Sequence, residues 1–347
     1  MSPEEVAKID GVDIVVGTKN KLKVFELISN GKKANIVTPV DKEDYEDMEI
    51  TLFESKTRAI IKAQDGCNNF CAYCIIPYAR GRIRSRDLNS IYNECKRLSE
   101  NGFLEIVLAG IHICSYGKDL EKTFSLSELL ALLDARHSCE RIRLGSLAPE
   151  LIGADFAERI SKLKILVPHF HVSVQSGSNS VLAAMKRRYN RQRALENVER
   201  LRTLIPEATF TADIMVGFPG ESDEDFLESV DFVRRARLLD APVFAFSARE
   251  GTPAYDMDNQ VSQAVKRERS RIMIEEKNRV RDSVLSDMVL AQRILPSVFE
   301  SACGEYYAGH SDTFSEVRVK SARDVRGELL MVRPLYHEDG IIYGEIV

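Results

Sequence analysis

The chain has 347 residues, of which 44% are hydrophobic and 29% charged, and its formal net charge is −5. This length and composition predict a globular protein with more than one domain. The negative net charge argues against a protein that coats nucleic acid indiscriminately, while it leaves room for a local basic site.

Targeting and redox features place further bounds on the chain. There is no run of about 18 uncharged apolar residues, so we expect no membrane-spanning helix. The acidic and polar start, "MSPEEVAKID", does not resemble a signal or transit peptide. Four of the seven cysteines are scattered singly: Cys95, Cys114, Cys139 and Cys303. Without a secretion signal, this favours reduced thiols and a cytoplasmic location.

Residues 1–50 predict little regular structure. We expect one short helix at "SPEEVAKI" and one strand at "VDIVVGT". About 50 residues are marginal as an independent domain, so we interpret this segment as a remnant of a larger α/β unit.

From residue 57 onward, β-rich apolar runs alternate with helical patterns. We expect six strands, at 57–65, 104–110, 141–147, 169–175, 210–218 and 242–248. Asp87 can cap the helix after the first strand and Gly102 can end it. Such alternation predicts parallel strands joined by crossover helices. Six units are too few for a closed eight-unit barrel, so we predict an α/β fold with an open, partial (βα)6 barrel. In barrels of this kind the chemistry gathers at the C-terminal ends of the strands.

Three cysteines follow the first of these strands within eight residues: Cys67, Cys71 and Cys74. The spacing Cys-x3-Cys-x2-Cys is typical of metal ligands. Structural zinc usually takes four ligands, commonly as two separated pairs. A [4Fe–4S] cluster normally takes four thiolates, so three would leave one iron open to another molecule. The triplet therefore predicts a cluster with an open iron, and a zinc site is the alternative.

A row of arginines comes directly after the triplet: Arg80, Arg82, Arg84 and Arg86. If the stretch is extended, the four side chains share one face. They are then either solvated surface charges or, beside a cofactor, ligands for phosphate or for a carboxylate.

Polar residues and glycines also mark the ends of later strands. "VLAG" offers backbone groups at Gly110, and "HVSVQSGS" offers Gln175 and Ser176, which either cap a loop or bind a cosubstrate. "DIMVGFPGES" (213–222) combines close backbone approach with carboxylates that can bind ribose hydroxyls. The alternation in "HFHVSVQ" places His169, His171, Ser173 and Gln175 on one face, which we expect to be the barrel lumen.

The pattern changes after a charged helix at 266–284, which we interpret as a connector. Short strands with turn signals follow in "GHSDTFSEVRVK", "VRGELLMVRPLY" and "GIIYGEIV". They predict a small all-β domain at 285–347.

These motifs, in this order, resemble the radical S-adenosylmethionine (SAM) enzymes, and most closely their methylthiotransferase branch. The resemblance rests on "GCNNFCAYCIIPYARGRIRSR", with Tyr73 just before the last cysteine, and on "EIVLAGIHICSYG", "HFHVSVQSGSNSVLAAMKRRY" and "DIMVGFPGESDEDF". The final β segment is similar to the TRAM module of that branch. Within the branch, the chain looks most like the bacterial enzymes that act on N6-threonylcarbamoyladenosine at tRNA position 37.

The resemblance implies a function and its cofactors. Cys67, Cys71 and Cys74 would hold a [4Fe–4S] cluster with SAM at the open iron, and reductive cleavage of SAM would yield a 5′-deoxyadenosyl radical that acts at C2 of the adenine. Residues implied to contact the cosubstrate are Tyr73, Gly110, Gln175, Ser176, Asp213, Gly217 and Glu221. The arginine row at 80–86 would contact the substrate, and no side chain is assigned as catalytic. The implied partners are tRNA and an electron donor of the flavodoxin or ferredoxin type, and we expect a monomer without a membrane partner.

One departure from the family leaves the function open. The resemblance implies three domains: a remnant of the N-terminal methylthiotransferase domain at 1–50, a radical SAM domain at 51–284 and a TRAM-like RNA-binding domain at 285–347. Family members carry three more cysteines near the N-terminus for a second, auxiliary [4Fe–4S] cluster, and no cysteine of this sequence matches those positions. The chain is therefore either a methylthiotransferase incomplete for sulfur insertion or an RNA-binding fragment without catalysis. A third alternative is a methylthiotransferase for another tRNA base or for a ribosomal protein.

Overall fold

The computed structural model of the chain describes residues 2–18, 20–31, 33–37, 45–48, 57–121 and 124–347. Its centre is an arc of six parallel strands: β3 (Arg58–Asp65), β5 (Glu105–Gly110), β6 (Arg141–Leu144), β7 (His169–Gln175), β8 (Thr209–Val216) and β9 (Val243–Ala245). Leu147 joins the first three strands to the last three, because its N–H donates to the His171 carbonyl and its carbonyl accepts from the Ser173 N–H, each at 2.8 Å. The partial barrel predicted from the strand–helix alternation is confirmed.

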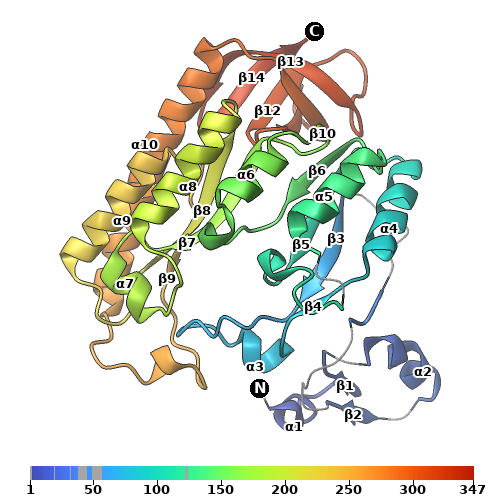
Figure 1. Cartoon of the computed structure of the whole chain (residues 1–347), viewed down its shortest axis with the longest axis vertical. Coiled ribbons are helices and arrows are strands. Elements are labelled where there is room, and N and C mark those ends of the chain that lie inside the picture. Colours follow the sequence, from blue (N-terminus) through green and yellow to red (C-terminus); the bar gives the residue numbers. More distant parts are fainter. Residues whose placement is uncertain (1, 19, 32, 38–44, 49–56, 122–123) are drawn as a thin grey trace.

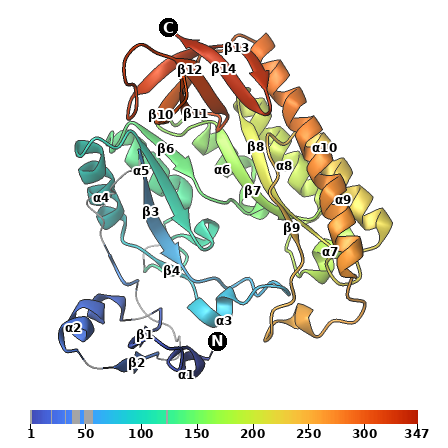
Figure 2. The same ribbon diagram turned by 180° about the vertical axis from the view of Figure 1, so that it is seen from behind.

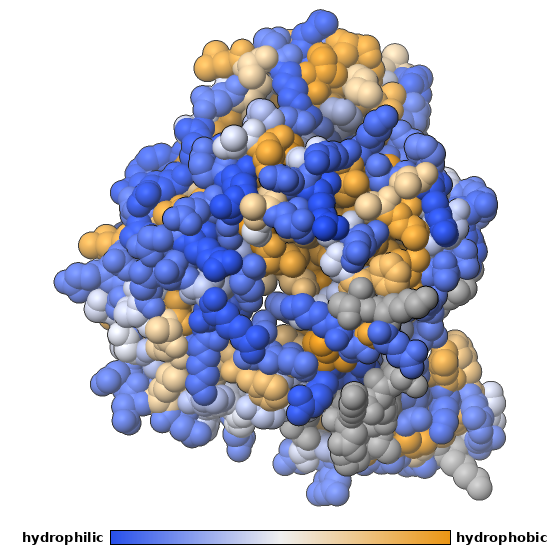
Figure 3. Space-filling model, in the orientation of Figure 1, coloured by the Kyte–Doolittle hydropathy of each residue, from blue (hydrophilic) through white to orange (hydrophobic). Residues whose placement is uncertain are grey.

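Helices cover the outer face of this arc (Figures 1 and 2). They are α4 (Leu88–Glu100), α5 (Leu126–Ala135), α6 (Ala154–Ile160), α7 (Asn179–Ala184), α8 (Arg191–Leu204) and α9 (Asp223–Ala236). Asp87 caps α4 by accepting a hydrogen bond from the Ser90 N–H, as its position predicts. On the side formed by α8, α9 and α10 (Gln263–Leu290), the molecular surface is mainly hydrophilic (Figure 3). The apolar faces of the crossover helices are thus turned to the strands.

The side chains of β7 show how the arc separates core from lumen. Phe170, Val172 and Val174 are buried in the main hydrophobic core, whereas His171 and Gln175 are only partly buried. Alternate residues of a strand point to opposite faces, so the polar set of β7 faces the inside of the arc. This confirms the common face predicted for the polar residues of "HFHVSVQ".

A closed five-stranded barrel follows α10. Its strands are β10 (Leu295–Cys303), β11 (Tyr306–Ser311), β12 (Glu316–Lys320), β13 (Leu329–Glu338) and β14 (Ile341–Ile346), in the order β10-β11-β12-β14-β13. It packs on the end of the arc where the parallel strands begin, opposite α3 (Ile76–Arg80) (Figure 1). The predicted C-terminal all-β unit is confirmed.

The N-terminal piece lies at the α3 end of the molecule (Figure 2). It contains α1 (Pro3–Val6), β1 (Ile14–Val16), α2 (Val24–Ser29) and β2 (Ala34–Ile36), with β1 and β2 paired in parallel. The expected boundary between residues 50 and 51 falls outside the described residues, and α10 runs across the one expected between 284 and 285. The three-domain division stays a prediction. In the described parts of the chain, no helix is both long and apolar enough to cross a bilayer.

The remaining elements are short. They are the strand β4 (Arg84–Ser85), which pairs antiparallel with β3, and four 3-10 turns at Lys21–Lys23, Ile113–Ser115, Pro149–Leu151 and Pro253–Tyr255.

Candidate functional site

The loop between β3 and α3 carries the three closely spaced cysteines at the C-terminal end of the first parallel strand. It begins at Gly66, whose φ of 71° is in the left-handed region. A Cβ at this position would lie 1.8 Å from the Arg82 carbonyl oxygen, so only glycine fits. The Cys67 N–H donates to the Gly81 carbonyl at 3.1 Å, and the Ala72 N–H donates to the Met185 carbonyl at 3.0 Å. The loop is thus fixed to its own return segment and to the end of α7.

The three thiols of this loop lie near one another and none is in a disulfide. Cys67 and Cys71 are buried, and Cys74 is half-buried. Burial raises the pKa of Cys67 and of Cys74, and the negative charge of Cys71 raises both further. Across the described residues, no three His, Cys, Asp or Glu side chains are close enough to share one metal ion. A four-iron cluster bonds each thiolate to a different iron. Three thiols on one fixed loop are donors of the kind that such a cluster takes, and their role as its ligands stays a prediction.

Asp65, the last residue of β3, gathers positive charge beside the loop. Lys62 donates to its carboxylate, and guanidinium nitrogens of Arg80 and Arg84 each lie 3.4 Å from it. Burial alone would raise the pKa of Asp65, but Lys62, the Gly66 N–H and Arg80 outweigh it, so the pKa is lowered. The aspartate therefore stays ionised and fixes the start of the loop.

The arginines at 80–86 do not form one extended row, which corrects the expected geometry. Arg80 ends the helix α3, whereas Arg84 belongs to β4. Arg84 is buried beside Asp65, and Arg86 is buried between Glu94 and Asp47. Arg82 is exposed. The alternating arginines did not predict this arrangement, because a helix and a turn interrupt the stretch. The acidic partners, such as Asp65 and Glu94, also lie outside it.

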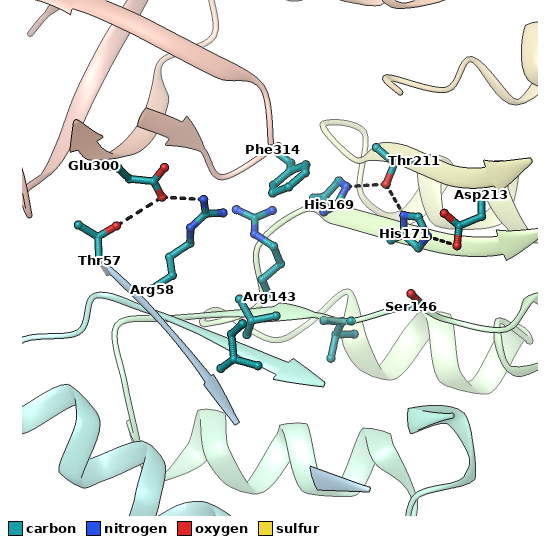
Figure 4. Close-up of a pocket in the computed structure, with 14 residues that line it drawn as sticks. Thr57, Arg58, Arg143, Ser146, His169, His171, Thr211, Asp213, Glu300 and Phe314 are labelled. Atoms are coloured by element: carbon teal, nitrogen blue, oxygen red, sulfur yellow. Dashed lines mark hydrogen bonds and ion pairs between the residues drawn. The ribbon is translucent and has the colours of Figure 1, made fainter. Parts of the chain in front are cut away.

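The lumen of the arc holds a cavity of about 650 Å³. It lies between β3 and β6 on one side and β7 and β8 on the other, with Phe314 of the C-terminal barrel at one end (Figure 4). Nine of its fourteen lining residues are polar or charged: Thr57, Arg58, Arg143, Ser146, His169, His171, Thr211, Asp213 and Glu300.

A chain of hydrogen bonds crosses one wall of this cavity. Thr211 Oγ1 lies 3.0 Å from His169 Nε2 and 2.9 Å from His171 Nδ1, and His171 Nε2 lies 3.2 Å from Asp213 Oδ2. His169 Nδ1 is buried and has no hydrogen-bond partner among the described residues. Burial and the nearby Arg143 lower the pKa of His169 well below its usual value, so this ring is neutral. The wall offers both donors and acceptors to a polar ligand.

Not all residues expected to contact the cosubstrate lie at the lumen or at the strand ends. Asp213 lines the cavity, whereas Gly110 and Gln175 end β5 and β7 at the edge of the arc that carries the cysteine loop. Gln175 has a φ of 70°, which is unusual for a residue with a side chain. Tyr73 instead packs into an apolar cluster with Phe218 and Phe246.

The remaining expected cosubstrate residues, Ser176, Gly217 and Glu221, hold loops in place. Ser176 is fully buried, and its hydroxyl lies 3.1 Å from that of Ser229 on α9. Glu221 Oε2 accepts hydrogen bonds from the Gly217 N–H at 2.6 Å and from Arg269 at 2.7 Å. Gly217 has a φ of 72° and allows this turn. A role for these residues in binding the cosubstrate stays a prediction.

The sequence did not single out Arg58, Arg143 or Phe314. Phe314 has a φ of 68° in the loop between β11 and β12, and its ring stacks on His169 with centroids 4.6 Å apart. Arg143 donates to the Ser311 and Asp312 carbonyls beside it. The signal that could have found Arg143 is its alternation in "RIRL", which places two arginines in a predicted parallel strand.

Three comparisons with known proteins bear on this site. Residues 61–233 match the Radical SAM superfamily. The chain is 35% identical over 345 residues to "Threonylcarbamoyladenosine tRNA methylthiotransferase MtaB" of Bacillus subtilis, covering 96% of this chain and 76% of that protein. It is 39% identical over 283 residues to "tRNA-2-methylthio-N(6)-dimethylallyladenosine synthase" of Clostridium tetani, covering 80% of this chain and 62% of that protein.

Among solved structures, the fold is similar to that of coproporphyrinogen III oxidase (HemN) from Escherichia coli. The TM-score is 0.50 at 12% identity, and the match covers 75% of this chain and 68% of that one. The radical SAM methyltransferase TsrM from Kitasatospora setae also has a TM-score of 0.50, at 15% identity, covering 65% of this chain and 52% of that one. These two likenesses bear on the fold alone.

Proposed function

Because this chain belongs to the radical SAM methylthiotransferase family of enzymes, we propose that it uses a [4Fe–4S] cluster and SAM to modify a tRNA adenine at C2. The observation that carries the proposal is the loop of Cys67, Cys71 and Cys74 at the C-terminal end of the first parallel strand, on the same arc as a polar lumen cavity. In folds of this kind, reacting groups meet at the C-terminal strand ends.

The three cysteines would hold the cluster, and the loop's fixed backbone would orient them. When bound, the cluster supplies the electron that cleaves SAM into methionine and a 5′-deoxyadenosyl radical. The chain's own part is to bind the cosubstrate, through Gly110, Gln175, Asp213 and their neighbours, and to exclude water from the lumen. The target base must leave the helical stack to enter it.

We infer that the base is N6-threonylcarbamoyladenosine rather than an adenine with an apolar substituent. With the adenine ring near the cysteines, the N6 substituent would extend into the lumen cavity towards Arg143 and His171. A threonylcarbamoyl group carries a carboxylate, a hydroxyl and amides, which suit these polar side chains. An isopentenyl group would bury these polar groups without returning any hydrogen bond. The name of the Bacillus subtilis relative agrees with this assignment, while the name of the Clostridium tetani relative favours the apolar base.

The proposed partners follow from this function. They are a tRNA and a small electron-transfer protein of the flavodoxin or ferredoxin type. Arg82 is exposed next to the cysteine loop, and we propose that it contacts the phosphates of the RNA.

Anaerobic reconstitution of the whole chain tests the reaction class. We expect about four irons per chain and reductive cleavage of SAM to 5′-deoxyadenosine, both abolished by Cys71→Ala. A folded protein that binds anticodon stem-loop RNA, yet neither takes up iron nor cleaves SAM, would instead be an RNA-binding module without catalysis.

The base assignment needs a second measurement. Two stem-loops that differ only in the N6 substituent at position 37, threonylcarbamoyl or isopentenyl, are compared for affinity to the reconstituted protein. We expect the threonylcarbamoyl RNA to bind about tenfold more tightly, the value of one charge-assisted hydrogen bond. Equal affinities, or a preference for the isopentenyl RNA, would overturn the base assignment and leave the reaction class standing.

A further inference from the structure

Each of the three clustered sulfurs accepts a hydrogen bond, but the donors differ in origin. The Asn69 N–H lies 3.5 Å from Cys67 Sγ, and the Ile76 N–H donates to Cys74. Both donors are backbone groups two residues further along the chain. The donor to Cys71 is instead a side chain from a remote segment: Arg187 Nη1 lies 3.4 Å from Cys71 Sγ. Of the three cysteines, Cys71 is therefore the one whose donor, among the described residues, is a charged side chain.

Arg187 is held in place by all of its other nitrogens. Nη2 donates to the Ser173 carbonyl of β7 at 2.8 Å, and Nε donates to the Tyr189 hydroxyl at 3.0 Å. The guanidinium also lies over the Tyr189 ring, 5.0 Å from its centroid. A planar fork with three fixed contacts leaves little freedom to the nitrogen that faces the sulfur.

The same segment is connected to the cysteine loop through the backbone. The Ala72 N–H donates to the Met185 carbonyl. Ala72 directly follows Cys71, and Met185 is two residues before Arg187, so this bond holds the two segments together. The Tyr189 hydroxyl lies within hydrogen-bond distance of the carbonyls of Ser173, at 3.0 Å, and of Val174, at 2.5 Å, both in β7. Strand β7 thus positions a positive charge against one cluster ligand on the loop of β3.

We propose that Arg187 is a positioning residue that holds the Cys71 sulfur and raises the reduction potential of the cluster on the three cysteines. The inference rests on the proposed function, because it requires that cluster. Adding an electron makes the cluster more negative, so a nearby positive charge and an N–H···S bond stabilise the reduced form. Partial burial of the guanidinium lowers the local dielectric and strengthens this effect.

Arg188 provides a matched control. It is the next residue, carries the same charge and is exposed, and it lies close enough to Cys67 to lower the pKa of that thiol slightly. An effect of net charge alone would appear in both arginines. An effect of the contact with Cys71 would appear only in Arg187.

The test compares the whole chain with Arg187→Met, Arg187→Lys and Arg188→Met. Each protein is reconstituted anaerobically, its iron is counted, and its midpoint potential is measured by titration with detection of the reduced cluster by electron paramagnetic resonance. We expect Arg187→Met to shift the potential to a more negative value, Arg187→Lys to lie between it and the parent, and Arg188→Met to match the parent. Faster loss of iron to a chelator from Arg187→Met than from Arg188→Met also supports the proposal, provided that the two apo-proteins melt at the same temperature.

The outcomes that overturn the inference are distinct from those that overturn the function. Equal potentials and equal iron retention in Arg187→Met and the parent would overturn the role of Arg187 alone. A parent chain that takes up no iron would overturn the proposed function and this inference with it.

A second measurement needs no substitution and decides the case where Arg187→Met fails to fold. The parent is labelled with ¹⁵N-arginine, and the reduced cluster is examined by electron–nuclear double resonance. A hydrogen bond from Nη1 to Cys71 Sγ predicts a ¹⁵N hyperfine coupling. Its absence from a fully loaded parent would show that the guanidinium does not contact the cluster, and would overturn the proposal.

Discussion

At the scale of single residues, His112 shows how a neutral, half-buried group supports the cysteine loop. Its Nε2 lies 3.0 Å from Asn69 Nδ2, and its Nδ1 lies 2.6 Å from Ser115 Oγ. Burial lowers the pKa of His112 from 6.5 to about 4, and the acidic Glu150 offsets this only in part. The ring is therefore neutral at pH 7, and it links the cysteine loop to the segment after β5.

The shift in His112 predicts a loss of stability in acid. Because the folded pKa is below the unfolded one, the unfolded chain binds a proton first. The stabilising contribution is complete above pH 6.5 and is lost as the pH falls from 6.5 towards 4. Urea unfolding should show a lower free energy of unfolding at pH 5 than at pH 7. We expect His112→Gln to make this difference smaller by on the order of 1–2 kcal/mol. The exposed His137→Gln is the control, and an equal acid loss in His112→Gln and the parent would contradict the expectation.

At the scale of elements, the turn from β3 into the cysteine loop depends on Gly66. Two costs meet there: a positive φ, and the Arg82 carbonyl in the place that a Cβ would occupy. Gly102, after α4, has a φ of 90° but nothing within 4 Å of its virtual Cβ. Comparing substitutions at Gly66 and Gly102 therefore distinguishes the cost of backbone strain from the cost of a steric clash.

We expect Gly102→Ala to cost about 1 kcal/mol in stability, from the strained φ alone. Gly66→Ala must also move the backbone at Arg82, so it should cost about 1–3 kcal/mol more and reduce iron binding by the three cysteines. Chemical denaturation and iron content after anaerobic reconstitution measure the two effects. Full iron binding by Gly66→Ala would show that the loop tolerates the displacement.

The elements also show what the sequence could predict. All six parallel strands and the final β segment were found because apolar periodicity and turn residues are local signals. The arginines at 84 and 86 were misjudged as members of one row because their burial depends on partners such as Asp65 and Glu94. The contact of Arg187 with Cys71 joins the segment between α7 and α8 to the loop after β3, so no local pattern could reveal it.

At the scale of the whole molecule, the C-terminal barrel closes one end of the lumen. Phe314 stands at the cavity floor, where Arg143 lies over its ring, 4.9 Å from the centroid (Figure 4). The same Arg143 bonds the Glu105 carboxylate of β5 and the Ser311 carbonyl of β11. The contacts of Arg143 with Glu105 and Ser311 form a seam between the arc and the C-terminal barrel. The sequence predicts a small β unit after residue 285, but it does not predict this seam, because the seam joins segments far apart in the chain.

The seam depends on one carboxylate. Glu105 is fully buried and lies within ion-pair distance of three guanidiniums: 2.6 Å from Arg141, 2.8 Å from Arg143 and 3.8 Å from Arg58. Burial alone would raise the pKa of Glu105, but Arg143, Arg141 and Arg58 together lower it, so the group stays ionised.

Removing this carboxylate leaves buried guanidiniums without their counter-ion, which typically costs about 3–5 kcal/mol. We therefore expect Glu105→Gln to lower the free energy of unfolding by about 3 kcal/mol or more. The surface pair of Asp155 and Arg159 is the control, and Asp155→Asn should change stability by about 0.5 kcal/mol or less. Urea unfolding followed by circular dichroism measures both. Because Arg143 bonds both sides of the seam, we expect a single transition that moves to lower urea concentration in Glu105→Gln. A free energy of unfolding that Glu105→Gln leaves unchanged would show that the seam does not depend on this carboxylate.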